Sequence, residues 1–146
     1  MQGARLSQAC LNLANLAGAD LRQCHMERAA LQEADVRRAK MLWIDLRSAD
    51  LRLANLTEAD MRGARLSNAD FRRAILSEAN MGEALLWDAT LEKAILQGTR
   101  LVGADMTRAH CAGAILWNAD LTEANVLNVD FSDVDLRQTI ISRDQL

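Results

Sequence analysis

Hydrophobic and polar residues recur along this chain with a period of five that keeps its phase throughout. A large apolar residue, the central residue of each repeat, returns at every fifth position from Leu6 to Ile141, and all 28 such positions are apolar. Two residues before each central residue is a small position, which is alanine 22 times. The exceptions at the small position are Cys24, Ile44, Thr99, Val129, Val134 and Thr139.

This five-residue period excludes an amphipathic helix. At about 100° per residue, each step of five would rotate the central residue by about 140°, so the leucines would circle the helix and leave no apolar face. In an extended segment, residues two apart point to the same side, so the small and central positions would face inward together. The two following residues must then turn the chain. The pattern therefore predicts short strands joined by corners in an all-β solenoid.

The corner residues support this prediction. Of the seven glycines, six occupy the second corner position, and only Gly82 does not. Glycine is favoured where the backbone angle φ must be positive. The outer position, between the small and central residues, is aspartate or asparagine in half of the repeats, for example at Asp50, Asn55 and Asp60. Such side chains accept hydrogen bonds from nearby backbone amides at turns.

The motif Ala-(Asp/Asn)-Leu-x-x, evident in three consecutive repeats over residues 49–63, resembles that of the pentapeptide-repeat family. The resemblance covers the whole chain and implies a right-handed quadrilateral β-helix, with four repeats per coil, as a single domain over residues 1–146. About seven coils of 20 residues would then stack into a rod of roughly 34 Å. Residues 20 apart would form columns, such as the interior column of Met41, Met61 and Met81.

Composition narrows the class of protein. The net charge is −3, which indicates neither a basic nucleic-acid footprint nor a strongly acidic surface. The first residues show no signal peptide, and no apolar run approaches the roughly 18 residues of a membrane span. We therefore expect a cytoplasmic protein that binds neither membrane nor nucleic acid. The three cysteines have no metal or redox spacing.

No catalytic, cofactor or metal site is expected from the residues. In the implied fold Cys24 and Cys111 face the interior four coils apart and Cys10 faces outward, so no disulfide can form. His25 and His110 lie at outer positions, and neither has a companion at metal-ligand spacing in the sequence. A convex rod with a filled interior should also offer no concave pocket. We therefore expect a protein that is not an enzyme.

Outward apolar residues are the candidate partner contacts. All three tryptophans fall at corner positions, and exposed tryptophan is a typical interface anchor. Isoleucine also replaces the polar outer residue three times at a spacing of 20, which predicts an outward ladder ending beside a tryptophan. The alternative is that these β-branched residues only strengthen coil stacking. The candidates are Ile75, Ile95, Ile115, Trp117, Trp87 and Trp43.

The C-terminal repeats suggest a second kind of contact. Their small positions are enlarged to valine, and no helical cap follows them, although solenoids usually carry capping elements. An open apolar end would favour an end-to-end homodimer. The candidate contacts are Val126, Val129, Phe131, Val134, Leu136, Ile140 and Ile141.

Three functions remain open at this stage. The first is a non-enzymatic rod that binds a protein partner. The second, implied by family members that protect DNA gyrase from quinolones, is a DNA mimic directed at gyrase or another topoisomerase. Duplex DNA carries one charge per about 1.7 Å, so a rod that mimics it would need on the order of 20 net negative charges. No column of outward residues has a net charge more negative than −2. The third is a structural spacer within a larger protein.

Overall fold

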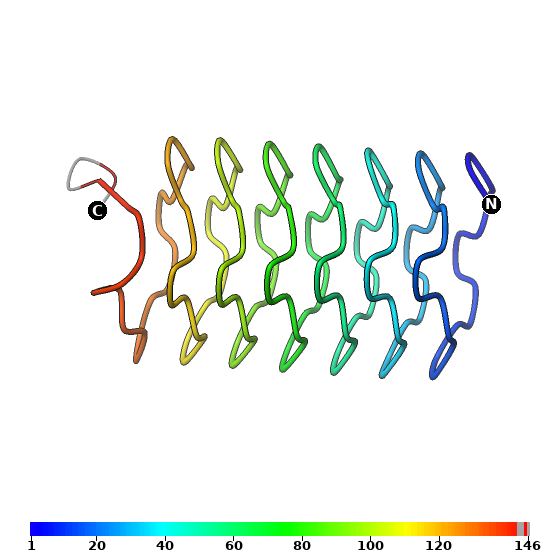
Figure 1. The fold of residues 1–146 in the computed structure, drawn as a ribbon, viewed down its shortest axis with the longest axis horizontal. Coiled ribbons are helices and arrows are strands. Elements are labelled where there is room, and N and C mark those ends of the chain that lie inside the picture. The colour runs from blue at the N-terminus through cyan, green and yellow to red at the C-terminus, as the bar shows by residue number, and fades with distance from the viewer. Residues whose placement is uncertain (143–144, 146) are drawn as a thin grey trace.

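The structure is a computed structural model that describes residues 1–142 and Gln145. The chain winds into coils that stack along one axis, with the two termini at opposite ends of the rod (Figure 1). Parallel bridges join outer positions 20 residues apart, from Arg5–His25 to Asp120–Ile140. One coil therefore contains four repeats, as expected.

The sides of the coils are shorter than predicted. The described residues contain isolated single-residue bridges at the outer positions and no strand. Each side has only three residues between corners, which is too few for a regular strand. The predicted short strand in each repeat is therefore reduced to one bridge residue.

The backbone of each repeat is bonded mainly to neighbouring coils. Three of the five amides donate to the coils on either side, and a fourth closes the corner. In one central repeat the bonds run from Asn55 N to Ala34 O (2.9 Å), Leu56 N to Ile75 O (2.7 Å), Glu58 N to Ser77 O (3.0 Å) and Ala59 N to Leu56 O (3.0 Å). The rod is therefore held along its length by backbone hydrogen bonds, and over the described residues its sides present no free sheet edge.

The fifth amide, at the first corner position, explains the outer aspartates and asparagines. The amide of Thr57 donates to Oδ1 of Asn55 at 3.1 Å. All fourteen outer Asp and Asn residues accept the same bond from the residue two positions later. These side chains complete the backbone bonding of their repeats, as the sequence predicted.

In every repeat from Gly3 to Asp133, the residue at the second corner position has a positive φ, between 54° and 68°. A turn with positive φ only at its third residue is type II. Most of these corners carry a side chain, so glycine is favoured but not required at most of them. At Gly63 space also favours glycine, because a Cβ there would overlap the indole ring of Trp43 unless that ring moved.

Small and central residues fill the interior. Leu56, Leu66 and Phe71 are fully buried, as are Met41, Met61 and Met81 in their shared column. Three of the exceptional small positions are also explained, because each donates a hydrogen bond to a carbonyl 23 residues earlier. These bonds run from Cys24 Sγ to Met1 O (2.9 Å), Thr99 Oγ1 to Leu76 O (2.8 Å) and Thr139 Oγ1 to Leu116 O (3.0 Å).

The last coil departs from this regularity. The amide of Leu116 has no backbone acceptor among the described residues, and the amide of Asn118 donates to the carbonyl of Gln138, one residue beyond the regular partner. Figure 1 shows the chain leaving the path of the preceding coils in this region. The Nε2 group of Gln145 donates to the carbonyls of Leu121 and Ala124 at 2.8 Å each, which caps part of the exposed end.

Candidate interaction surface

The predicted isoleucine ladder lies on one outer face of the rod. Bridges join Ile75 to Ile95 and Ile95 to Ile115, so the three side chains occupy consecutive coils. The first two are half-buried, Ile115 is 37% exposed, and Trp117 at the adjacent corner is 46% exposed. We call these four residues the isoleucine stripe. The structure brings them together as the 20-residue spacing predicted.

The isoleucines remove a hydrogen-bond acceptor from each of their repeats. In the same column, Asn15, Asp35 and Asn55 bond the amide two residues later. Isoleucine cannot, so the amides of Ser77, Gln97 and Trp117 have no acceptor among the described residues. A row of three free backbone donors therefore runs along one edge of the isoleucine stripe. The sequence alone does not reveal this row, because it follows from the bonding of the other repeats.

Two cations lie at the other edge of the stripe. Arg73 and Lys93 precede Ile75 and Ile95 by two residues, and neither forms an ion pair with another described residue. They line a surface hollow of about 400 Å³ together with Leu53, which is 50% exposed. The sequence did not single out Leu53, Arg73 and Lys93 as candidate contacts, although their 20-residue spacing is visible in it.

The remaining charges around this hollow largely cancel. The guanidinium groups of Arg52 and Arg72 are paired with Asp50 and Asp70, at 2.7 and 2.6 Å. Glu92 also lines the hollow and opposes part of the charge of Arg73 and Lys93. The hollow therefore retains an excess of one positive charge, carried by groups that have no ion-pair partner.

The other two tryptophans are exposed as predicted but lie on other corners. Trp43, 58% exposed, extends over Gly63 and borders a hollow of about 510 Å³. Trp87, 39% exposed, borders another of about 500 Å³ that also includes Ser67. The expectation that the rod has no concave surface is therefore wrong, because rows of side chains at the corners leave hollows between them. The three tryptophans do not form one surface.

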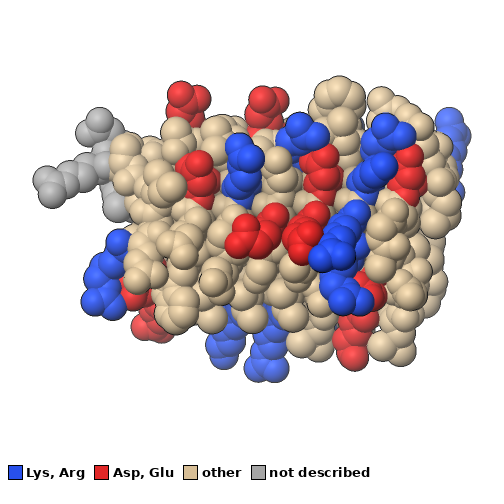
Figure 2. Space-filling model, viewed as in Figure 1, with Lys and Arg blue, Asp and Glu red and all other residues tan. Residues whose placement is uncertain are grey.

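Most outer aspartates are paired with arginine. The pattern Asp-x-Arg occurs seven times, and each guanidinium donates to both carboxylate oxygens. Hydrogen bonds from Arg22 lower the pKa of Asp20 to about 2, and those from Arg137 lower the pKa of Asp135 to about 2. Positive and negative side chains are accordingly interleaved on the face in Figure 2. No column of the described residues is a continuous acidic ribbon.

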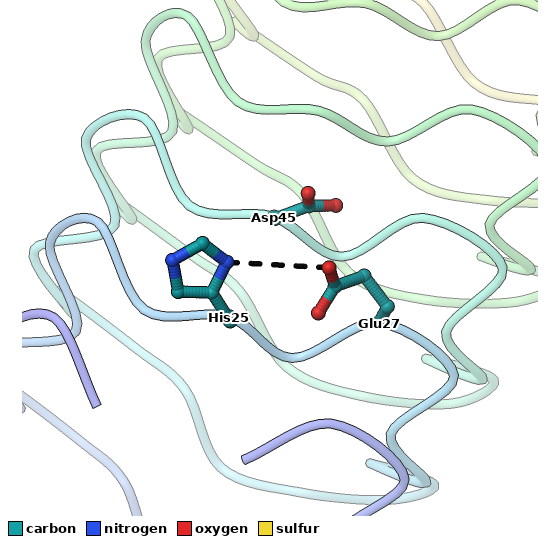
Figure 3. A group of neighbouring side chains, drawn as sticks. All are labelled: His25, Glu27 and Asp45. Carbon is teal, nitrogen blue, oxygen red and sulfur yellow. Dashed lines mark ion pairs between the residues drawn. The ribbon is translucent and has the colours of Figure 1, made fainter. Parts of the chain in front are cut away.

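The structure also corrects the interpretation of His25. Its imidazole lies beside Glu27 and Asp45, with Nδ1 at 4.0 Å from a Glu27 oxygen (Figure 3). One potential ligand atom from each residue lies within 4.8 Å of the others. Asp45 belongs to the next coil, so sequence spacing alone did not reveal this companion.

Arginine already occupies the carboxylates of this cluster. Nη2 of Arg47 is 2.6 Å from Asp45 and 3.2 Å from Glu27, and Arg65 is 3.4 Å from Asp45. Burial opposes ionisation of Asp45, but the hydrogen bonds from Arg47 and the charge of Arg65 more than offset it, so its pKa is lowered. A divalent cation would have to displace Arg47 and bind beside Arg65. The arrangement favours an ion-pair network over a metal site.

The cysteines lie as predicted, with Cys10 exposed and Cys24 and Cys111 buried, and all three are free. Burial, with a contribution from Asp130, raises the pKa of the Cys111 thiol to about 12. A protonated thiol in the interior is a poor nucleophile. This residue therefore has a packing role.

The candidate dimer contacts at the C-terminal end are mostly packed against the core. Val126 is buried, and Ile140 is 58% exposed. The other five are half-buried: Val129, Phe131, Val134, Leu136 and Ile141. Together with the cap from Gln145, this leaves less open apolar surface than the sequence suggested, and end-to-end association stays a prediction. Among the described residues, no helix is both long and apolar enough to cross a membrane.

Comparison with protein families identifies the repeat. The sequence profile of pentapeptide repeats matches the chain in eight copies, over residues 1–38, 9–47, 39–78, 49–88, 70–110 and 101–138. Proteins of this family fold as right-handed quadrilateral β-helices. No curated protein sequence matches the chain.

One solved structure shows the same fold, and two others match the chain with lower structural similarity. A trypsin-treated form of QnrB1, a plasmid-mediated fluoroquinolone resistance protein, is 21% identical over 99% of this chain and 83% of its own, with a TM-score of 0.55. HetL from Nostoc sp. strain PCC 7120, involved in regulating heterocyst differentiation, is 25% identical over 97% of this chain and 90% of its own, with a TM-score of 0.36. A pentapeptide repeat protein from the Arabidopsis thaliana thylakoid lumen is 24% identical over 99% of this chain and 72% of its own, with a TM-score of 0.38.

Proposed function

The chain belongs to the pentapeptide-repeat family, and from this premise we propose that it is a non-enzymatic rod of seven coils that binds a protein partner through the isoleucine stripe. The observation that carries the proposal is the loss of three consecutive outer hydrogen bonds. Asparagine or aspartate at Ile75, Ile95 and Ile115 would bond the next corner amide, as in neighbouring coils. Isoleucine instead exposes apolar surface, which favours a role in contact with another molecule.

The proposal is tested by returning the stripe to the polar pattern of the repeat. Ile95→Asn places at this position the residue found at Asn55, and its Oδ1 can accept the amide of Gln97. Combined with Trp117→Gln, it should preserve the fold and abolish capture of the partner from an extract of the source organism. Circular dichroism and thermal melting check the fold.

A matched control changes exposed apolar residues on other corners. Trp43→Gln with Leu127→Gln removes similar surface, since these residues are 58% and 61% exposed. This variant should capture the same partner as the unmodified rod. Capture that survives the stripe variant in a folded protein would contradict the proposed function.

A DNA mimic directed at gyrase is the alternative drawn from the sequence. The arginine pairing of most outer aspartates argues against it, because a DNA mimic must present carboxylates that are not already neutralised. The likeness to QnrB1 concerns the fold and does not carry this activity. A gyrase supercoiling assay separates the DNA mimic from the partner-binding rod. We expect neither inhibition of gyrase nor protection from quinolones at micromolar concentrations of the protein. A spacer role remains the third alternative, and it predicts that no surface variant changes partner capture.

A further inference from the structure

The isoleucine stripe has a definite chemistry along both edges. One edge carries the free amides of Ser77, Gln97 and Trp117, and the other carries Arg73 and Lys93 without ion-pair partners. Every one of these groups is a hydrogen-bond donor, and two are cations. A partner that covers the stripe must therefore supply acceptors on both sides of its apolar contact, and negative charge on the side of Arg73 and Lys93.

The rod itself shows which group these free amides bind. In the preceding coils of the same column, the corresponding amides are bonded by the Asp35 carboxylate at 3.2 Å and the Asn55 carbonyl at 3.1 Å. In the following coil Asp135 does the same at 3.1 Å. A carboxylate from a partner could take the place that isoleucine leaves empty in the three central coils.

The spacing of the stripe fits a helix. Coils stack at about 4.8 Å, and an α-helix presents one turn per 5.4 Å. Over the two intervals between Ile75 and Ile115, the turns of the helix and the stacked coils would differ in axial position by only about 1.2 Å. A strand places same-side residues about 6.6 Å apart and would fall out of step by about 3.6 Å. A helix also brings a satisfied backbone, which matters because most amides on this face already bond neighbouring coils.

We propose that the isoleucine stripe binds an amphipathic α-helix that lies along the rod axis, with apolar residues once per turn and acidic residues on both flanks. The apolar residues contact Ile75, Ile95 and Ile115, and Trp117 covers one end of the helix. Carboxylates on one flank approach Arg73 and Lys93, and those on the other accept the free amides. This inference rests on the proposed function and specifies the class of partner.

The test uses a displayed library of helical peptides selected on the intact rod. Each peptide has leucine once per turn, and its flanking positions vary among Asp, Glu, Lys, Gln and Ser. Clones that bind the rod but not the Ile95→Asn/Trp117→Gln variant should be enriched in Asp and Glu at the flanks. Their affinity should fall as salt concentration rises, since the flanking contacts are electrostatic.

Charge reversal identifies the cations responsible. Arg73→Glu with Lys93→Glu should weaken a selected acidic peptide by about tenfold or more, and selection on this variant should favour Lys flanks instead. Glu92→Gln should strengthen the same peptide by about twofold, because it removes the acid that borders the hollow. The matched control is Arg28→Glu with Arg100→Glu. It reverses two cations on other faces that form no ion pair with another described residue, and it should leave affinity within about twofold.

The outcomes separate the two proposals. Binding clones without acidic flanks, or an acidic preference unchanged by reversal of Arg73 and Lys93, would overturn the acidic-helix inference and leave the stripe as a binding surface. Clones that bind the Ile95→Asn/Trp117→Gln variant equally well would contradict the proposed function too. A library with no clone specific for the stripe would reject both.

Discussion

The central coils and the last coil use the same five-residue pattern with different results. In the central coils alanine holds nearly every small position, and each central amide bonds the next coil, as Leu96 does to the carbonyl of Ile115 at 2.8 Å. In the last coil valine replaces alanine at 129 and 134, and the amide of Leu116, in the coil before it, has no such acceptor among the described residues. The difference teaches that an enlarged small position is accommodated where coils stack on both sides. Ile44, in a central coil, also replaces alanine, but the regular bonds remain, from Asp45 N to Cys24 O at 2.9 Å and from Met26 N to Asp45 O at 2.7 Å.

The largest expected effect comes from enlarging a small position in a central coil. Ala59 is fully buried, and Ala59→Leu should reduce the free energy of unfolding by about 3 kcal/mol because the interior cannot expand. Val134→Leu in the half-buried last coil should cost less than about 1 kcal/mol. Chemical denaturation of both variants measures the difference. Equal losses would show that the small position does not distinguish the coils.

Acid should destabilise the rod as a whole. Arginine-paired outer carboxylates have lowered pKa values in the folded state, about 2 for Asp20 and Asp135. The others are Asp35, Asp45, Asp50 and Asp60. Their contribution to stability is complete above about pH 4, near the pKa of unfolded Asp and Glu, and is lost as pH falls toward 2. The melting temperature should therefore fall between pH 4 and pH 2. A melting temperature that stays constant to pH 2 would contradict this.

The same pairs differ between the coils. The side chain of Asp45 is almost fully buried beneath Arg47 and Arg65. The ion pair of Asp135 is open to solvent, because the side chain of its partner Arg137 is 87% exposed. Asp45→Asn keeps the acceptor for the corner amide but removes the charge, and it should cost about 2 kcal/mol at neutral pH. Asp135→Asn should cost measurably less. Thermal melting of the two variants compares them, and the reverse order would be evidence against the ion-pair network as a stabilising element.

A smaller effect is expected from the two interior threonines. Thr99 is fully buried and donates to the carbonyl of Leu76, so Thr99→Val should cost about 1 kcal/mol. Thr139 makes the equivalent bond in the half-buried last coil, where Thr139→Val should cost less than about 0.5 kcal/mol because water can replace the hydroxyl. Denaturation of the single and double variants checks both values. A larger loss at Thr139 would place the better-packed interior in the last coil.

The last comparison changes no residue. Leu96 and Leu116 are both fully buried, but only the Leu96 amide bonds the next coil. Amide hydrogen exchange followed by NMR should be at least roughly tenfold faster at Leu116, since exchange follows local opening. Similar protection at the two amides would indicate that the last coil is bonded as tightly as the central ones.

Particular residues show how far the sequence predicts this protein. The burial of Leu56 and Leu66 and the exposure of Trp43, Trp87 and Trp117 follow from phase alone, and these predictions are confirmed. The companions of His25 and the corner hollows were not foreseen, because they depend on side chains from neighbouring coils. The acidic-helix site was only half visible: the isoleucines could be read from the sequence, but the free amides could not.

The sequence by itself determined which side of the backbone each residue faces, where the chain turns and which residues fill the interior. A five-residue period is sufficient for this because inward and outward directions are set within each repeat. The tertiary structure decided which residues meet across coils, including the Arg47 pairs and the row of donors beside the isoleucine stripe. The physical reason is that the number of repeats in a coil depends on how the corners close and stack, and a period of five does not specify that number.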